Sequence, residues 1–364
     1  MVPRLFESTA TAFTSLGICP LPDAVSCLVT EERNDQYTLE MVYPIDGFGF
    51  NEIKVDRIIL ALAHDGDSHA QPFRIESIHG DIGATVTVNA VHISYQLNWI
   101  ICEKFASSSG TDSPTRFWNG CNNHVISTSQ PFDFNTDYTG DYSGSHNFGA
   151  PEATPFRTLL GGMENSMLDI WHGEFEWDLW DVNFWQNRGA DNGVYISYGK
   201  NLTGIDWDTD VSETYTGVVA FWKQEDAYVE GSIQHVGGSF AFERTIVLDA
   251  SDHWQSQPTT TQLNNYAASY VKANAINPVV SCAINFVPLW QTEEYKDFAD
   301  LEKVNLCDTV HIVYPPLELE LTAKVVKTVF NVLLERYDSI QISTAKKNLA
   351  NTIFAMQKEI EKKK

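Results

Sequence analysis

The chain of 364 residues lacks any long apolar segment. No uninterrupted hydrophobic run approaches the roughly 20 residues that a bilayer-spanning helix needs. Residues 1–20 hold one arginine and a broken apolar pattern, which is not typical of a secretory signal. We therefore expect neither membrane insertion nor export through a signal peptide.

Basic residues are scarce. Lysine and arginine together number 24 against 48 aspartates and glutamates, so the formal net charge is −24. A surface this acidic repels phosphate backbones, which disfavours sequence-specific binding of nucleic acid. The acidity can serve solubility alone, or it can line a channel through which DNA passes without sticking. Composition leaves both interpretations open.

Paired cysteines of the CxxC type are also missing. The six cysteines are scattered along the chain, at Cys19, Cys27, Cys102, Cys121, Cys282 and Cys307. Their even number would allow disulfides. A chain with 43% hydrophobic residues and no signal sequence nevertheless favours reduced, mostly buried thiols.

Motifs of well-known active sites are absent from the sequence: there is no GxSxG elbow, no HExxH helix and no P-loop. Cys121 and His124 have the spacing of a metal-ligand pair, but no second pair follows, so the signal for zinc is weak. His146 and His172 could be imagined as bases, yet single histidines are most simply surface or hydrogen-bonded residues. We predict no catalytic, metal-binding or cofactor-binding residue, and no cofactor.

Aromatic residues, in contrast, are concentrated in residues 161–205. Four of the ten tryptophans fall between positions 171 and 185. Apolar and acidic residues alternate from position 174, as in a half-buried strand. The alternation changes phase at Trp180, which indicates a bulge or a bend, and turn-forming residues at 187–193 then precede a second strand at 194–198. The pattern predicts a heavy aromatic hairpin against which neighbouring units pack.

Tryptophan-dense hairpins are more often core or subunit interface than sugar-binding surfaces, because such side chains bury large areas. The interface candidates in this stretch are Trp171, Phe175, Trp177, Trp180, Trp185 and Tyr198.

Three carboxylates, Glu174, Glu176 and Asp178, share one face of the first of these strands. Some glycosidases place carboxylates in this way, because an acid and a nucleophile must flank one bond at about 5 Å. A solvent-facing polar edge opposite Phe175 and Trp177 explains the pattern more simply. We therefore expect no active site here.

Along the chain, short alternating strands joined by Asp/Gly turns predict an antiparallel β-barrel over residues 1–100. Residues 101–190 form an irregular α+β domain with short helices at 155–160 and 166–171, and it ends in the aromatic hairpin.

The C-terminal half returns to strand-rich texture. A second, split β-barrel is predicted over residues 191–225 and 304–343, and an α+β insertion with a helix at 258–274 interrupts it over 226–303. Residues 344–364 read as a Lys/Glu-rich helix leading to a possible extension. The predicted class is mainly β with α+β insertions: two related antiparallel barrels plus two inserted domains.

The sequence resembles the prophage endopeptidase-tail family, the N-terminal hub regions of phage tail-associated lysins and tail-tip proteins. The most specific matches are LDIWHGEFEWD at 168–178 and RGADNGVYISYGKNLT at 188–203. Further matches are TEERN at 30–34, QPFRI at 71–75 and LERYD at 334–338.

The resemblance implies a structural hub of a phage tail tip or baseplate, like those of contractile tails. In such a hub, three chains form a pseudo-sixfold ring that continues the tail tube and gates the DNA channel at host attachment. The implied partners are the distal tail protein ring, the tape measure protein and the tail tube, with DNA passing through and the host surface met indirectly. The implied location is the tail tip of the virion.

Two alternatives stay open. The family name includes an endopeptidase, so the chain could be a cell-wall-degrading peptidase or glycosidase that uses Glu174 and Glu176. It could also be a monomeric carbohydrate-binding module that uses Trp177 and Trp180. The lack of a catalytic motif leads us to predict that the chain is not an enzyme.

Overall fold

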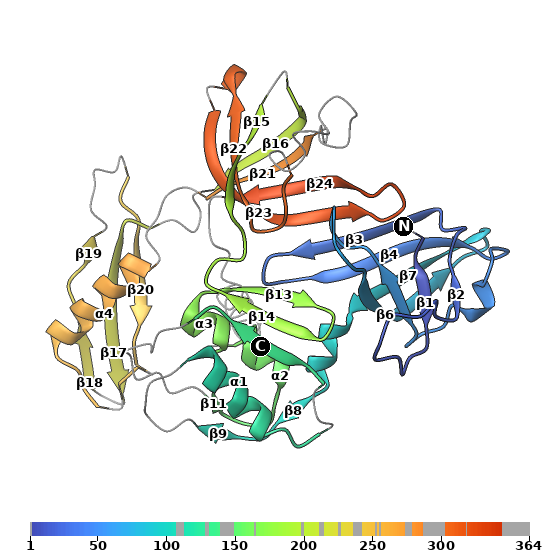
Figure 1. The fold of residues 1–364 in the computed structure, drawn as a ribbon. Coiled ribbons are helices and arrows are strands. Elements are labelled where there is room, and N and C mark those ends of the chain that lie inside the picture. The colour runs from blue at the N-terminus through green and yellow to red at the C-terminus, as the bar shows by residue number, and fades with distance from the viewer. Residues whose placement is uncertain are drawn as a thin grey trace. The chain divides into compact units, whose positions relative to one another are not determined.

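Strands dominate the computed structural model of the chain, as the alternating patterns predict (Figure 1). The structure describes residues 2–106, 113–127, 131–138, 149–163, 165–197, 200–210, 215–224, 227–235, 242–251, 253–254, 256–273, 279–286, 303–317 and 319–343. The helix predicted at 344–364 lies outside these residues.

The first seven strands follow one another with antiparallel neighbours, in the order β3-β4-β7-β6-β5-β1-β2. They are β1 (Arg4–Phe6), β2 (Cys19–Pro20), β3 (Ser26–Glu32), β4 (Tyr37–Pro44), β5 (Ile58–Ala61), β6 (Gln71–Gly80) and β7 (Thr85–His92). Half-buried and buried side chains alternate along β3 and β7, because successive residues of a strand point to opposite faces. The predicted strands of this region are confirmed.

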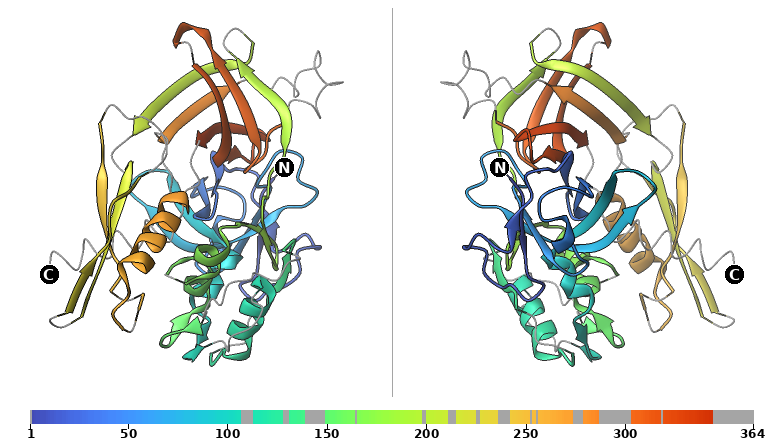
Figure 2. Two further views of the ribbon diagram at one scale, coloured as in Figure 1. Left: turned by 90° about the vertical axis from the view of Figure 1, so that its left-hand side faces the viewer. Right: turned by 90° about the vertical axis from the view of Figure 1, so that its right-hand side faces the viewer.

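Six further strands extend the same sheet (Figure 2). They are β15 (Asp191–Ser197), β16 (Leu202–Asp210), β21 (Val279–Phe286), β22 (Thr309–Tyr314), β23 (Leu319–Asn331) and β24 (Arg336–Ser343). β15 pairs with β22 in parallel, so the purely antiparallel pairing predicted from the sequence is wrong here. Parallel neighbours need a long crossover connection, and the long segment of chain between β15 and β22 supplies one.

The long strand β23 joins the two groups of strands. Its first half, Leu319–Lys324, pairs with β22, and its second half, Lys327–Asn331, pairs with β3. Strand β24 pairs with β23 on the other side, from Lys324 to Asn331. One hydrogen-bonded sheet of 13 strands results. The mainly β class is confirmed, whereas the two closed barrels and the two inserted domains stay predictions.

Short elements fill the segment between the two groups. Its helices are α1 (Pro114–Asn123), α2 (Phe156–Gly161) and α3 (Met167–Trp171), and it begins with the 3₁₀ helix η2 (Ile93–Asn98). Two further 3₁₀ helices lie outside this segment: η1 (Phe50–Glu52) follows β4, and η5 (Pro315–Leu317) follows β22. The strands of the segment are β8 (Ile101–Cys102), β9 (Phe105–Ala106), β10 (Asp133–Thr136), β11 (Gly149–Ala150), β12 (Thr154–Pro155), β13 (Glu174–Asp178) and β14 (Asp181–Trp185). Both predicted short helices are confirmed. Ser166 caps α3 by accepting a hydrogen bond from the Asp169 amide.

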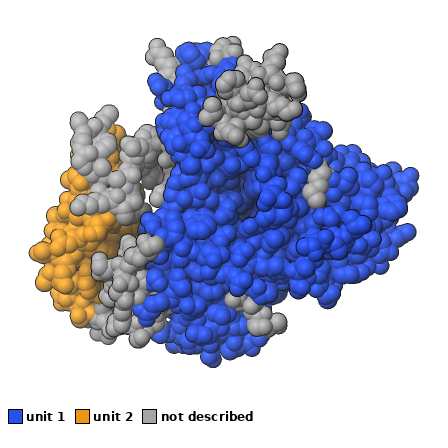
Figure 3. Space-filling model, viewed as in Figure 1, with its two compact units in different colours: residues 1–206, 282–364 blue, residues 207–281 orange. Residues whose placement is uncertain are grey.

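Residues 207–281 form a compact unit of their own, and the rest of the chain forms the other (Figure 3). The smaller unit holds β17 (Gly217–Gln224), β18 (Ala227–Glu230), β19 (Gln234–His235), β20 (Thr245–Asp249) and α4 (Thr260–Ala273). Val218, Ala220 and Trp222 of β17 pack with Leu263 and Ala267 of α4, and all five are buried. The predicted helix is therefore confirmed, with the spacing that buries one of its faces.

Candidate functional site

The aromatic hairpin is shorter than the sequence predicts. β13 and β14 pair antiparallel from Glu174↔Trp185 to Asp178↔Asp181, so the turn consists of Leu179 and Trp180. Leu179 has a φ of 51°, in the left-handed region that a two-residue turn requires. The phase change at Trp180 is thus a chain reversal, and the predicted bulge or bend within one strand is wrong. The predicted second strand, β15, pairs with β22 instead.

Three of the six interface candidates are buried within the chain. Trp171, Phe175 and Trp177 are 5%, 4% and 7% exposed. The Phe175 ring stacks on Trp177 at 5.1 Å and lies 4.7 Å from Phe184. Trp171 meets Phe117 of α1 edge to face at 5.8 Å. These three side chains therefore pack inside the chain.

The other candidates lie further out. Trp180 and Trp185 are half-buried, and Tyr198 lies outside the described residues. The Trp180 indole donates to the Thr11 carbonyl at 2.8 Å, and the Trp185 indole donates to Glu176 Oε2 at 2.8 Å. The interface role of the whole set stays a prediction.

Arg157 of α2 is held between two rings beside the hairpin. Its guanidinium carbon lies 4.1 Å from the Tyr95 ring centre and 4.6 Å from that of Trp177. Its Nη1 donates to Ser94 Oγ at 3.1 Å. Burial lowers the pKa of Arg157, and the nearby Tyr95 and Asp35 oppose that shift. Phe175 and Arg157 both lie against Trp177, and the residue is 7% exposed, so little of that ring is accessible to a sugar.

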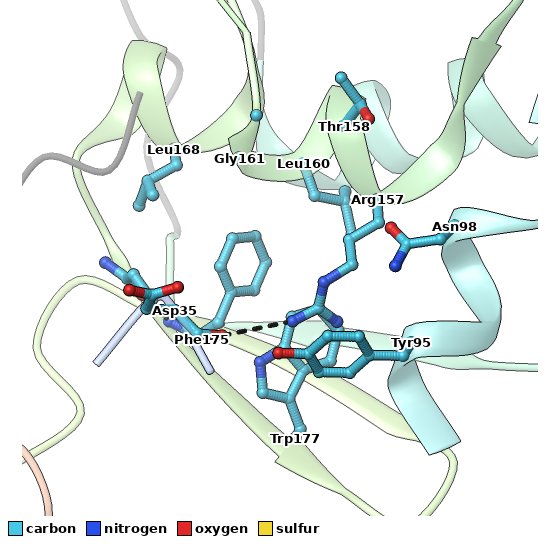
Figure 4. A pocket seen from close by; sticks show the side chains of 12 residues that line it. Asp35, Tyr95, Asn98, Arg157, Thr158, Leu160, Gly161, Leu168, Phe175 and Trp177 are labelled. Carbon is cyan, nitrogen blue, oxygen red and sulfur yellow. Dashed lines mark hydrogen bonds between the residues drawn. The ribbon is translucent and has the colours of Figure 1, made fainter. Parts of the chain in front are cut away.

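A pocket of about 250 Å³ opens next to this stack (Figure 4). Its lining comes from the β3–β4 turn, η2, α2, α3 and β13, and consists of Asn34, Asp35, Tyr95, Asn98, Arg157, Thr158, Leu160, Gly161, Gly162, Leu168, Phe175 and Trp177. Among the described residues of this lining, Asp35 is the one carboxylate, and none is a histidine or a cysteine. These described residues hold no cysteine or histidine beside the Asp35 carboxylate, of the kind that nucleophile–base pairs in group-transfer sites use.

Charged side chains are buried on the other side of the hairpin. Arg188 grips Glu31 with two hydrogen bonds, from Nη1 to Oε1 at 2.6 Å and from Nη2 to Oε2 at 3.4 Å. His64 Nε2 lies 2.5 Å from the same carboxylate. Burial alone would raise the pKa of Glu31, but the charges of Arg188 and His64 lower it to about 2. Glu31 is thus a buried side chain of β3 that stays ionised.

Glu174 binds several donors at the same place. Its carboxylate accepts from Lys324 Nζ at 2.9 and 3.1 Å and from the Arg188 backbone amide at 2.8 Å. Arg33 Nη1 approaches its Oε1 at 3.5 Å. Glu174 is 3% exposed, so the predicted solvent-facing position is wrong for this residue. We call Glu31, Arg33, Glu174, Arg188 and Lys324 the charged junction.

The remaining two carboxylates of the strand also have partners. Glu176 accepts from the Trp185 indole, and Asp178 lies 2.5 Å from His69 Nε2 and accepts from Gln71 at 2.7 Å. A glycosidase needs two carboxylates facing one bond across an accessible cleft. Here the Glu174 carboxylate faces Lys324 and Arg33. The arrangement therefore stabilises the fold and does not form an acid–nucleophile pair.

The sequence contained a signal for the charged junction that we did not use. Glu31 continues the buried phase of Cys27 and Val29 along β3, so its carboxylate had to face inward and needed a cation. Its partner Arg188 lies 157 positions away along the chain. Local pattern could not identify that partner.

The weak metal signal is not supported by the positions of its residues. His124 Nδ1 lies 2.8 Å from the Gly120 carbonyl and its ring stacks on Phe105 at 4.5 Å, whereas Cys121 is buried beside Cys102. In the part of the chain that the structure describes, no three His, Cys, Asp or Glu side chains gather as metal ligands. His172 ends α3 in the left-handed region, and His146 lies outside the described residues. Within the same part, no helix is long and apolar enough to cross a membrane.

Comparison with known proteins confirms the resemblance drawn from the sequence. Residues 190–353 match the family model of the prophage endopeptidase tail. That segment runs from β15 through β24 and begins just after the charged junction residue Arg188. No curated protein sequence matches the chain.

Three solved structures of tail proteins share its fold over nearly the full length. Prophage tail protein gp18 from Listeria monocytogenes EGD-e is 14% identical, with 100% of both chains covered and a TM-score of 0.58. The tail protein from Neisseria meningitidis MC58 is 8% identical, with 96% of this chain and 98% of that one covered and a TM-score of 0.58. The 43 kDa tail protein of prophage MuSo2 from Shewanella oneidensis is 9% identical, with 95% and 98% covered and a TM-score of 0.61. At these identities the likeness concerns the fold.

Proposed function

We propose that this chain, which has the fold of prophage tail proteins, is the structural hub of a phage tail tip or baseplate. The observation that carries the proposal is the extent of the likeness. The tail-protein fold covers 100% of this chain and 100% of the Listeria protein, so it is not confined to one module. The family match over residues 190–353 points the same way.

The proposed hub is a homotrimer in which each chain supplies two related β-barrels. The first is residues 1–100; the second is residues 191–225 with 304–343, and residues 101–190 and 226–303 are insertions. The pairing of β3 with β23 supports this plan, because it ties the two groups of strands into one hydrogen-bonded sheet. Three such chains would form a closed ring of six β-barrels. Six barrels would match the sixfold symmetry of a hexameric tail tube.

The acidic surface fits a channel for DNA. With a net charge of −24, the ring would repel the phosphate backbone and let DNA slide past. The proposed partners are the distal tail protein ring, the tape measure protein and the tail tube, and the proposed site is the tail tip of the virion. The hub would open the channel at host attachment.

A structural role also fits the side chains around the hairpin. Glu174 is held by Lys324 and the Arg188 amide, and Trp177 is covered by Phe175 and Arg157. Both groups serve the fold of the chain itself. The rival proposals, a wall-degrading enzyme and a monomeric sugar-binding module, require these same groups to face a substrate.

Light scattering on the purified full-length chain tests the proposal. A trimer has three times the chain mass of 40.9 kDa, and a stable dimer would count against the ring. Incubation with purified cell walls tests the rivals: the hub proposal expects no release of soluble fragments and no binding of wall polysaccharide. Loss of a measured wall-degrading activity in Glu176→Gln would instead favour the enzyme.

A further inference from the structure

Two cysteines that are distant in sequence lie together between β8 and α1. Cys102 is the last residue of β8, and Cys121 lies in the last turn of α1. The Cys102 sulfur donates to the Cys121 carbonyl oxygen at 3.4 Å. Both residues are fully buried and both are free thiols. The contact between the Cys102 sulfur and the Cys121 backbone places the two residues side by side.

The backbone holds Cys102 in this position from two sides. Cys102 pairs with Thr154 of β12 and forms an isolated bridge with Val125. Val125 lies two residues beyond the end of α1 and four residues beyond Cys121. The Glu103 amide also donates to the His124 carbonyl at 2.8 Å. Main-chain contacts therefore hold the end of α1 against β8, and they keep Cys102 and Cys121 next to each other.

We propose that Cys102 and Cys121 are a dithiol site that closes to an intramolecular disulfide and fastens β8 to the last turn of α1. The chemistry of the site does not depend on the hub role. The hub role explains only when the bond would form. A virion component passes from a reducing cytosol to oxidising surroundings, where disulfides persist.

The step is a thiol–disulfide exchange with a small-molecule disulfide such as oxidised glutathione. The Cys102 thiolate, formed by loss of its proton to solvent, attacks one sulfur of the oxidant and displaces one reduced thiol, which leaves a mixed disulfide on Cys102. The Cys121 thiolate then attacks the Cys102 sulfur and displaces the second thiol. Two protein thiols are oxidised to one disulfide, and the oxidant is reduced to two thiols.

The electrostatics favour Cys102 as the attacking thiol. A hydrogen bond from the Cys121 thiol lowers the pKa of Cys102, against the effect of burial. Burial instead raises the pKa of Cys121. The thiolate is the nucleophile in such exchange, so the first mixed disulfide is expected on Cys102. Because both thiols are buried, exchange requires the last turn of α1 to open transiently.

The other described cysteines have a different environment. Cys27 and Cys307 are buried, and burial raises the pKa of each to about 12. Cys19 is half-buried near the Gly49 backbone. Cys19, Cys27 and Cys307 serve as internal controls. Each carries a thiol, and among the described residues none of them contacts a second thiol.

Peptide mapping of the full-length protein tests the proposal without any substitution. Trypsin cleaves after Lys104 and Arg116, so Cys102 and Cys121 fall in different peptides, 75–104 and 117–157. After treatment with oxidised glutathione and alkylation of remaining thiols, we expect these peptides as one linked species that lacks two hydrogen atoms. Reduction should separate them. Oxidation should also raise the unfolding temperature by about 5 °C, because the bond closes a short loop in the unfolded chain.

Variants separate this site from general oxidation. Cys102→Ala and Cys121→Ala should each abolish the linked species and the temperature shift, whereas Cys19→Ala should retain both. Two alkylated cysteines at 102 and 121 in oxidised wild-type protein that keeps its native circular dichroism would overturn the proposal. A glutathione adduct that persists on Cys102 would overturn it as well, because the second step would then not occur. Neither outcome bears on the oligomeric state, so the hub proposal would be judged separately.

Discussion

The charged junction and the core of residues 207–281 stabilise the chain in different ways. The junction brings together ionic groups from segments far apart in sequence, Glu31, Glu174, Arg188 and Lys324. The smaller unit packs apolar side chains of β17 and α4 from a single continuous stretch, and no buried ion pair occurs among its described residues. Loss of a junction contact should therefore loosen several segments at once, whereas damage to the smaller unit should stay local.

The largest effect is expected for Arg188→Met. The substitution removes the bidentate partner of Glu31 and leaves its buried carboxylate with His64 as its remaining charged partner. Breaking a buried pair in this way typically lowers the free energy of unfolding by about 3–5 kcal/mol. Chemical denaturation measures the change. The matched control is Arg336→Met. Arg336 Nε lies 3.8 Å from Asp338 Oδ1, and both side chains are exposed, so this substitution should lower the free energy of unfolding by no more than about 1 kcal/mol. Equal effects of the two variants would remove the distinction between the junction and the surface.

A local effect is expected for Leu263→Ala in α4. Leu263 is fully buried in the core of residues 207–281, and truncating a buried leucine costs about 2–5 kcal/mol. Hydrogen exchange followed by mass spectrometry should show faster exchange in peptides from β17 and α4 and unchanged exchange around Glu174. Val247→Ala is the control, because Val247 is 66% exposed. Faster exchange throughout the chain would show that the smaller unit is not independent.

A moderate, pH-dependent effect is expected for His92→Asn. His92 accepts from the Ser94 amide at 3.3 Å through Nδ1, and its Nε2 lies 3.3 Å from Gln71 Oε1, so the neutral ring fits the site. Burial lowers the pKa of His92 to about 3. Between pH 6.5 and 3 the unfolded chain binds a proton there that the folded chain does not, so stability falls with falling pH.

The measurement is the free energy of unfolding at pH 6.5 and at pH 4.5, where wild type should lose about 2 kcal/mol more than the variant. The change in stability between pH 6.5 and pH 4.5 reports on His92. The pKa of Glu31 is lowered to about 2, so Glu31 changes the stability mainly below pH 4.5. Identical losses in wild type and variant would contradict the account of a neutral buried His92.

The smallest effect on folding is expected for Trp180→Phe. The indole donates one hydrogen bond to the Thr11 carbonyl, so its loss should cost about 0.5–1.5 kcal/mol. Light scattering on the same variant asks whether Trp180 lies in a subunit contact. A near-native subunit with a weakened trimer would place it there, whereas an unchanged trimer would remove Trp180 from the interface candidates.

Much of the strand and helix pattern could be predicted from the sequence, because alternation and caps are local properties. The Asp/Gly turns between the first strands are an example. The hairpin turn at Leu179 was missed because leucine seldom adopts a positive φ. The parallel pairing of β15 with β22 and the contact between Arg188 and Glu31 join residues more than a hundred positions apart, and no local pattern specifies such partners.

The most direct test of the central claim is the symmetry of the assembled chain, seen by electron microscopy of particles formed from the full-length protein with its tail tube. The hub account predicts a ring of three chains with threefold symmetry, a pseudo-sixfold outline and an open or plugged centre on the tube axis. A particle of two or six chains, or chains bound singly to the outside of the tube, would contradict it.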